Sequence, residues 1–327
     1  MSADIMETST KAAGDHPTGR GMLGPVLAGV GGLLLVIAGM IHFYAVPKLA
    51  VAPVNVDSTT HLQALGAEIF DTGTLKPITT DLSVENRTVG DADSSRKAPA
   101  HTVVWASMTT IRSSDGVIRS RSTSSSAMNN KTAEAVNCCG NFDESADGTR
   151  TPTHPTGLVY KFPFFTEKKT YQVWDDSLGK AVTTKYAGTT TIQGMRVYKF
   201  TSDVPATVIG QMSVPASVMG LSGKGNVDAD SYYQNATTQY IEPATGAVIN
   251  RVSQVKQWYS YQGHDLVTTN ADMAYTPQTI STYVHDYQGK ATLLKLVAGP
   301  VPWLVMVLGL VLIGGGFAAA RRSVRQK

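Results

Sequence analysis

Two long stretches without a charged residue constrain this chain more than any other feature. The first runs from Gly21 to Pro47 and the second from Leu296 to Ala320. Each exceeds the roughly 20 residues that a helix needs to cross the hydrocarbon core of a bilayer, which is about 30 Å thick. We therefore predict transmembrane helices at 21–46 and 296–320, and exclude an ordinary soluble protein.

The charges that follow the second stretch predict its direction. Residues 321–327 carry four cations and no acid, and such a segment stays in the cytoplasm. Two spans then place both the 1–20 tail and the basic 321–327 tail in the cytoplasm and residues 47–295 outside. We expect a two-pass plasma-membrane protein whose main domain is extracytoplasmic.

The first stretch has two readings. Its apolar core is longer than the roughly 7–15 residues of a cleaved signal peptide, which favours an uncleaved signal anchor. Ala50-Val51-Ala52 nevertheless resembles a peptidase site, although Pro53 would directly follow the cut. Cleavage therefore stays an alternative.

Small residues occur at helical spacing in both stretches and allow two backbones to approach closely. Either the two helices pack on each other or on a partner, or Gly and Ala are simply common in membrane helices. The packing positions that we predict are Gly24, Ala28, Gly32, Gly314 and Ala318.

The charge balance of the outer segment excludes nucleic-acid binding. Six basic and three acidic residues lie outside 47–295, which leaves 22 of each sign within it and a net charge of zero. A nucleic-acid binder needs a basic field to displace counterions.

Strand patterns dominate the outer segment beyond residue 100. Thr102–Arg112 is rich in β-branched residues, and turns at Gly194 and at Pro243–Gly246 predict two hairpins. The hairpins cover Lys185–Phe200 and Thr237–Val252, and a further pair runs over Gln254–Tyr261 and Leu266–Tyr275. We predict a mainly β, antiparallel extracytoplasmic domain with a few short helices.

Two helical segments are expected in this domain. His61–Ala67 could form one or two turns, and Thr279–Lys295 has apolar spacing that suits a helix leading into the second span. The strands do not suggest a membrane barrel, because their alternation is short and their polar positions are rich in Thr and Ser.

No catalytic motif occurs. The five histidines of the outer segment are not spaced as metal ligands, and no HExxH, G-x-S-x-G or phosphate loop is present. We therefore expect no enzyme, no metal and no cofactor. An envelope hydrolase or transferase would need residues that only the fold brings together.

The only two cysteines, Cys138 and Cys139, are adjacent. An oxidising compartment permits a vicinal disulfide with a local structural role. Free thiols and an intermolecular bridge are the alternatives.

The densest aromatic cluster lies between residues 160 and 174. It forms either part of the core or the wall of an apolar cavity that holds an acyl chain. Its members are Tyr160, Phe162, Phe164, Phe165, Tyr171 and Trp174.

The same region carries a family resemblance. A recognisable set of segments comprises Gly157–Phe165, Lys168–Tyr171, Trp174-Asp175, Ala187–Phe200 and Glu242–Gly246. With these segments, the chain from Gly21 to Arg322 resembles the actinobacterial porin PorA family, in which a β-rich domain lies between two terminal transmembrane helices. The resemblance implies a mycolate-type cell envelope, and it supplies no catalytic residues. Helical anchors belong in the inner membrane, which disagrees with the word porin.

Three functions remain for such a chain. The first is an anchored envelope protein whose outer domain binds or transfers a lipid or lipoglycan. The second is a pore or transport component, and the third is an envelope hydrolase or transferase. The expected partners are membrane lipid, an envelope lipid or lipoglycan, and either a second copy of the chain or another envelope protein.

Overall fold

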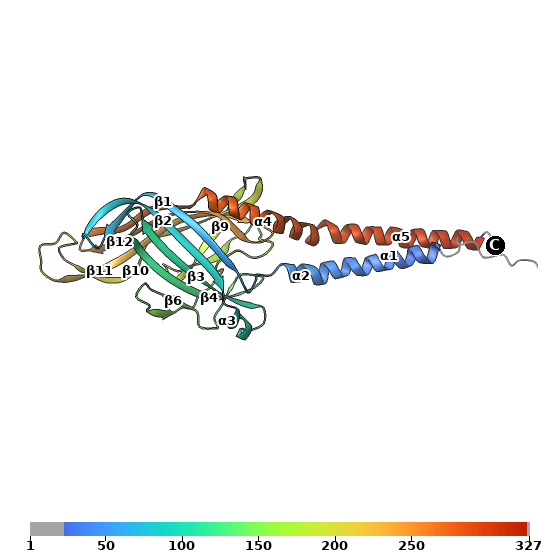
Figure 1. The fold of residues 1–327 in the computed structure, drawn as a ribbon, viewed down its shortest axis with the longest axis horizontal. Coiled ribbons are helices and arrows are strands. Elements are labelled where there is room, and N and C mark those ends of the chain that lie inside the picture. Colours follow the sequence, from blue (N-terminus) through green and yellow to red (C-terminus); the bar gives the residue numbers. More distant parts are fainter. Residues whose placement is uncertain (1–22, 326–327) are drawn as a thin grey trace, which may run out of the picture. The chain divides into compact units, whose positions relative to one another are not determined.

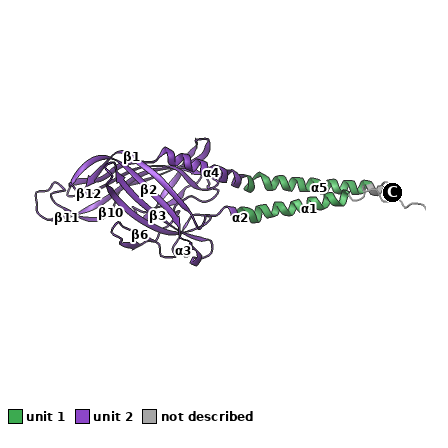
Figure 2. Ribbon diagram, in the orientation of Figure 1, with its two compact units in different colours: residues 1–46, 296–327 green, residues 47–295 purple. Residues whose placement is uncertain are grey.

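The computed structural model describes residues 23–325, with side chains up to Arg322. The predicted 1–20 tail, residues 21–22 of the first predicted span and the end of the basic 321–327 tail lie outside the described residues. The chain divides into two compact units (Figure 2), which are described separately. One unit contains residues 23–46 and 296–325, and the other contains residues 47–295.

The first unit is a pair of helices. Helix α1 (Leu23–Met40) continues through a π-helical segment (Ile41–Ala45) into α2 (Val46–Leu49), and its partner is α5 (Pro300–Arg325). Two helical stretches, Leu23–Leu49 and Pro277–Arg322, are long and apolar enough to span a membrane by length and composition. The predicted pair of apolar helices flanking a β-rich domain is confirmed.

Glycines lie where α1 meets α5. A Cβ on Gly24 would lie 2.8 Å from the carbonyl oxygen of Gly316, and one on Gly31 would lie 2.5 Å from that of Gly309. A side chain at any of these positions would push the backbones apart.

The predicted packing positions match this interface only in part. Gly24 and Ala28 face α5, because a Cβ on Gly316 would lie 2.8 Å from Ala28 N. Gly32 and Gly314 have open space around their Cβ positions, and Ala318 is exposed. The interface glycines are seven residues apart on each helix, at 24 and 31 on α1 and at 309 and 316 on α5. Seven residues make almost two helical turns, so both glycines of a pair lie on nearly the same face. Gly32 is eight residues from Gly24 and therefore lies outside that face.

The second unit is built on one 13-stranded sheet whose strand pairs are all antiparallel (Figure 1). The strand order is β7-β6-β4-β3-β2-β1-β13-β12-β11-β10-β9-β8, with β5 beside β4. The strands are β1 (Asp57–Asp71), β2 (Lys76–Gly90), β3 (Thr102–Ser113), β4 (Ile118–Asn129), β5 (Ala135–Val136), β6 (Phe142–Glu144), β7 (Arg150–Pro152), β8 (Tyr171–Asp175), β9 (Lys180–Ile192), β10 (Met195–Pro215), β11 (Asn226–Glu242), β12 (Ala247–Tyr261) and β13 (His264–Tyr275). The predicted fold class, mainly antiparallel β, is confirmed.

Residues 48–100 depart from the prediction. The expected helical turns at His61–Ala67 are wrong, because this segment lies within β1, which pairs with β2 along its length. Gly66 has a φ of 63° and forms a bulge, so that Ala64 and Ala67, three residues apart, are both buried. That spacing imitates the i, i+3 pattern of a helix.

Two further helices belong to this unit. Asp91 caps the N-terminus of helix α3 (Ala92–Lys97), because its side chain accepts the Ser94 N–H. Helix α4 (Pro277–Ala298), expected at 279–295, follows β13 and bonds to β1, since the Thr279 hydroxyl donates to His61 O at 3.0 Å. Val284 of α4 packs against β10 and β12 residues such as Val197 and Ile249.

The sheet curls until its two halves share a core. Figure 1 shows β1 to β4 in front of β9 to β12. One hydrophobic cluster joins Trp105 and Met128, from β3 and β4, to Phe200 and Ile241, from β10 and β11. We call the concave side that these residues occupy the trough, and side chains on it in-facing.

The two sheet edges are joined at one end only. Ala135 N donates to Gly157 O and Leu158 N donates to Gln172 O, both at 2.8 Å, so that residues 157–158 link the β5 side to β8. Elsewhere β9 pairs with β10 only at Met195–Thr201, which leaves residues 202–215 of β10 as a free edge. The facing edge of β4 is unpaired over residues 118–122.

Candidate functional site

The predicted aromatic cluster closes the joined end of the trough. Phe162 is 2% exposed, and its ring centre lies 4.7 Å from Phe200 and 5.3 Å from Tyr171. Tyr160 donates its hydroxyl to Trp105 O at 2.6 Å and accepts the Ser126 N–H at 3.0 Å. Together with partly buried Trp174, these residues form a packed plug rather than the wall of an empty cavity.

Phe164 and Phe165 have a different environment. They line an open groove of about 710 Å³ beside the plug, together with Pro155, Pro163 and one side of Tyr171. Phe165 is 40% exposed. The predicted cluster is therefore divided between a core and a surface groove, because the chain reverses between residues 160 and 166.

A strap of residues 160–166 covers the end of the plug. Phe162 N donates to Gly246 O at 2.9 Å, and Thr166 N donates to Pro243 O at 2.7 Å. Gly246 has a φ of 71°, and a Cβ there would lie 2.0 Å from Phe162 O. The Pro243–Gly246 turn therefore supports the strap as well as joining β11 to β12.

The strap also buries a lysine. Lys161 Nζ lies 3.6 Å from the centre of the Phe164 ring and has no hydrogen-bond partner among the described residues. Burial lowers the pKa of Lys161 to about 7, and Glu242 partly opposes this. Glu242 is fully buried and is ion-paired at 2.8 Å with Lys295.

The first and last residues of the second unit lie at this closed end. Ala50, Ala244, Ala291 and Leu294 pack into one small cluster against Phe164. Ala52 N donates to Asn130 O at 2.7 Å, and Trp105 Nε1 donates to Pro53 O at 3.0 Å. These contacts fix residues 50–53 and 291–294 against the closed end of the trough.

A band of polar in-facing residues follows the plug along the trough, and we call it the polar band. It begins with Arg251 on β12, whose Nε donates to Ser253 Oγ at 3.1 Å. From there hydrogen bonds run through Thr237 and Asn235 to Tyr233, whose hydroxyl donates to Asp175 Oδ2 at 2.9 Å.

Two further carboxylates of the polar band come from opposite ends of the strand order. Asp143 lies on β6 opposite in-facing Ser124, and Asp176 lies in the turn after β8. Solvent reaches Asp176, yet enclosure by the protein and then the charge of Asp143 raise the pKa of Asp176 to about 6. Burial also raises the pKa of Asp143.

Aliphatic side chains line the trough beyond the polar band. Ala64, Ala67, Leu82 and Ala271 are buried there, with Ile111 packed against them. At the far end, the turn that contains Met219 folds over Ala229 and Tyr259. The free edge of β10 beside this region exposes Val208, Ile209 and Met212 by 48%, 38% and 49%.

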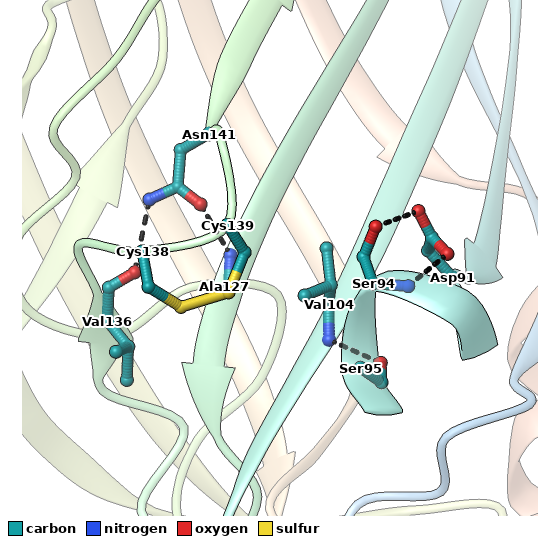
Figure 3. The surroundings of a disulfide bond; sticks show 9 residues. All are labelled: Asp91, Ser94, Ser95, Val104, Ala127, Val136, Cys138, Cys139 and Asn141. Carbon is teal, nitrogen blue, oxygen red and sulfur yellow. Dashed lines mark hydrogen bonds between the residues drawn. A yellow bond between two sulfur atoms is a disulfide. The ribbon is translucent and has the colours of Figure 1, made fainter. Parts of the chain in front are cut away.

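The two cysteines form a disulfide with each other (Figure 3). Beside them, Asn141 accepts the Ala127 N–H at 2.8 Å and donates to Val136 O at 3.1 Å. The disulfide loop thus lies against β4 where its partner changes from β6 to β5. Within the described part of the chain, no group of three or more His, Cys, Asp or Glu residues could hold a metal ion.

Sequence reasoning missed the polar band. Asp143, Asp176 and Arg251 come from three separate segments, and no local spacing joins them. One sequence feature could have indicated the polar band. Successive residues of a strand point to opposite faces, so Arg251 lies on the same face of β12 as buried Ser253. A charged residue on a buried face is unusual.

Comparison with known proteins gives the family. The chain matches the family model described as Porin PorA over residues 23–318. A curated Porin PorA from Corynebacterium amycolatum is 25% identical over 227 residues, which are 56% of this chain and 59% of that relative. The match therefore spans less than two thirds of the relative's length.

A solved structure of a DUF1329 family protein from Desulfovibrio piger covers 76% of this chain and 91% of its own, with 9% identity. Its TM-score of 0.21 is too low to carry an argument about fold or function. The family match covers α1, the whole sheet and most of α5, and the chain belongs to the PorA family.

Proposed function

We propose that the β-rich domain binds an amphipathic envelope molecule, a lipid or lipoglycan, in its trough and holds it at the outer face of the plasma membrane. The observation that carries the proposal is the graded lining of the trough. A polar band lies next to an aliphatic region, and in-facing Ser120 and Ser122 on β4 are exposed to solvent. This sequence of surfaces matches a molecule with a polar head and an apolar tail.

The route of entry follows from the closed end. The aromatic plug and the strap occupy the joined end of the trough, so we infer that a ligand enters between the free edges of β4 and β10. Exposed Val208, Ile209 and Met212 at this edge supply an apolar rim that a chain can cross without full hydration. The 157–158 link joins the two sides of the sheet at the opposite, closed end.

The proposed topology follows from the charges beside the helices. Both termini are cytoplasmic and residues 47–295 are extracytoplasmic, because cations follow the second helix without any acid. Two helices then hold the domain near the source of its ligand. The packed glycines of α1 and α5 make the anchor a single paired element.

Native mass spectrometry of full-length protein extracted from its own membrane tests the proposal. We expect a bound lipid or lipoglycan on the wild-type protein. Ser122→Trp should remove it, because position 122 is in-facing, whereas Arg121→Trp on the opposite face should retain it. Ligand-free wild-type protein, or equal occupancy in both variants, would contradict a ligand in the trough.

A further inference from the structure

We propose that the strap and the open groove beside it contact the phospholipid head groups of the membrane surface. The inference rests on the two membrane anchors of the proposed function, and it does not require a ligand in the trough. Three features carry it: an exposed aromatic side chain, the contact of the strap with residues next to both predicted spans, and the lining of the groove.

The strap holds an aromatic ring in solvent. Phe165 is 40% exposed, and no other Phe, Tyr or Trp side chain within residues 47–295, all of which are described, is as exposed. Its backbone has a φ of 55°, a left-handed conformation that costs free energy in a residue with a bulky side chain. The Phe165 N–H donates to Ala244 O at 3.0 Å, which holds this conformation. A ring that the fold exposes at a cost is typical of a contact surface.

The strap lies beside the residues that lead into the predicted spans. Phe164 packs against Ala50 and Leu294. Leu294 lies two residues before the predicted span 296–320, and Ala50 lies four residues after the predicted span 21–46. Because a chain extends by at most about 3.6 Å per residue, these two residues lie within about 7 Å and about 14 Å of the spans. Polar head groups extend about 5–8 Å beyond the hydrocarbon core, so the strap is within reach of them.

The groove beside the strap has both apolar and charged walls. Its volume is about 710 Å³, and Pro163, Phe164 and Phe165 supply part of the apolar wall. Lys169 and Glu167 line the same groove and are ion-paired with each other at 2.8 Å. An amphipathic molecule fits this lining better than a wholly apolar one.

A lysine beside the groove suits the phosphate of such a molecule. Lys168 is exposed and forms no ion pair with a described residue, and its Nζ lies 5.5 Å from the ring centre of Tyr198. Glu134, an acid on the groove wall, also has no ion-pair partner among the described residues, so a free phosphate gains little from the net charge. A phospholipid gains more, because its phosphate can lie beside Lys168 while its glycerol and first methylenes cover Phe165.

Photocrosslinking of full-length protein in liposomes of phosphatidylcholine and phosphatidylglycerol tests the inference. The photoreactive residue p-benzoyl-phenylalanine replaces Phe165, which keeps an aromatic ring at this exposed site. The matched control replaces Val117, which is 46% exposed in the turn between β3 and β4, away from the plug. We expect phospholipid adducts at position 165 and none at position 117.

A charge variant distinguishes head-group contact from mere proximity to lipid. Lys168→Gln, combined with the photoreactive residue at position 165, should lower the phosphatidylglycerol share of the adducts by up to about fivefold. This factor corresponds to about 1 kcal/mol for one lysine near an anionic surface. Lys76→Gln, at an exposed position at the start of β2, should leave the share unchanged.

The outcomes separate this inference from the proposed function. Absence of lipid adducts at position 165, equal adducts at positions 165 and 117, or a phosphatidylglycerol share that Lys168→Gln does not change would overturn the inference. Crosslinking of position 165 to a protein instead of a lipid in native membranes would also overturn it. Lipid adducts at position 165 on a protein whose trough is ligand-free in native mass spectrometry would uphold the inference and refute the proposed function.

Discussion

Replacing Lys161 by methionine should stabilise the domain, although it removes a charge that faces a carboxylate. The Nζ atom is buried against the Phe164 ring without a hydrogen-bond partner. Burial lowers the pKa of Lys161 from its ordinary 10.5 to about 7, so the native state binds this proton less strongly than the unfolded chain does. Methionine fills a similar volume without this cost, and Glu242 keeps its ion pair with Lys295.

The magnitude and the pH dependence follow from proton linkage. Between about pH 7 and 10.5 the unfolded chain binds more protons at this site, so wild-type stability rises with pH across that window. Below pH 7 both states are protonated and the whole cost applies. A pKa difference of 10.5 to about 7 corresponds to at most roughly 5 kcal/mol, which falls to about 1 kcal/mol at pH 10.

Thermal and denaturant unfolding of full-length protein in detergent at pH 6, 8 and 10 measures this effect. Lys161→Met should unfold at higher temperature than the wild type at pH 6, and the difference should shrink steadily toward pH 10. Lys76→Met, at an exposed position, serves as the matched control and should show no such trend. A destabilised Lys161→Met protein, or a gain that does not depend on pH, would refute the reasoning.

Four other predictions concern separate parts of the chain. Phe162→Ala should lower the free energy of unfolding by about 3–5 kcal/mol in denaturant titrations, because it empties the centre of the plug; a loss below 1 kcal/mol would mean a loosely packed end. Asp176→Asn should raise the melting temperature above pH 6 and have no effect near pH 4. The raised carboxyl pKa makes wild-type stability fall as pH rises from 3.8 to about 6, and the amide removes this loss. Equal gains in melting temperature at both pH values would contradict this reasoning. Gly316→Leu should destabilise the helix pair in detergent melts while Gly314→Leu is tolerated, and the reverse order would place the interface on another face. Alkylation of untreated mature protein followed by intact mass measurement should label neither cysteine, and two added labels would show free thiols.

Local chemistry explains which parts of the fold were predictable from the sequence. The charge-free stretches and the turns at Gly194 and at Pro243–Gly246 encode helices and hairpins within short windows. The bulge at Gly66 defeated the same reasoning in β1, because it changes which alternating residues are buried. Helix α4 was predictable since its apolar residues recur along a single segment.

The site was less predictable than the fold. The aromatic cluster was visible as composition, but whether a ring becomes core or groove depends on the strap's reversal and on its hydrogen bonds to the β11–β12 turn. The polar band required Asp143, Asp176 and Arg251 to be brought together by the order and curvature of the sheet. Neither property is encoded at a fixed spacing.

Photocrosslinking in the intact native membrane tests most directly whether the trough holds a ligand. The photoreactive residue p-benzoyl-phenylalanine would replace Ile111, which is in-facing, or its neighbour Thr110, which lies on the opposite face of β3. We predict a lipid or lipoglycan adduct at position 111 and none at position 110. Adducts at both positions, or at position 110 alone, would contradict a ligand held inside the curled sheet.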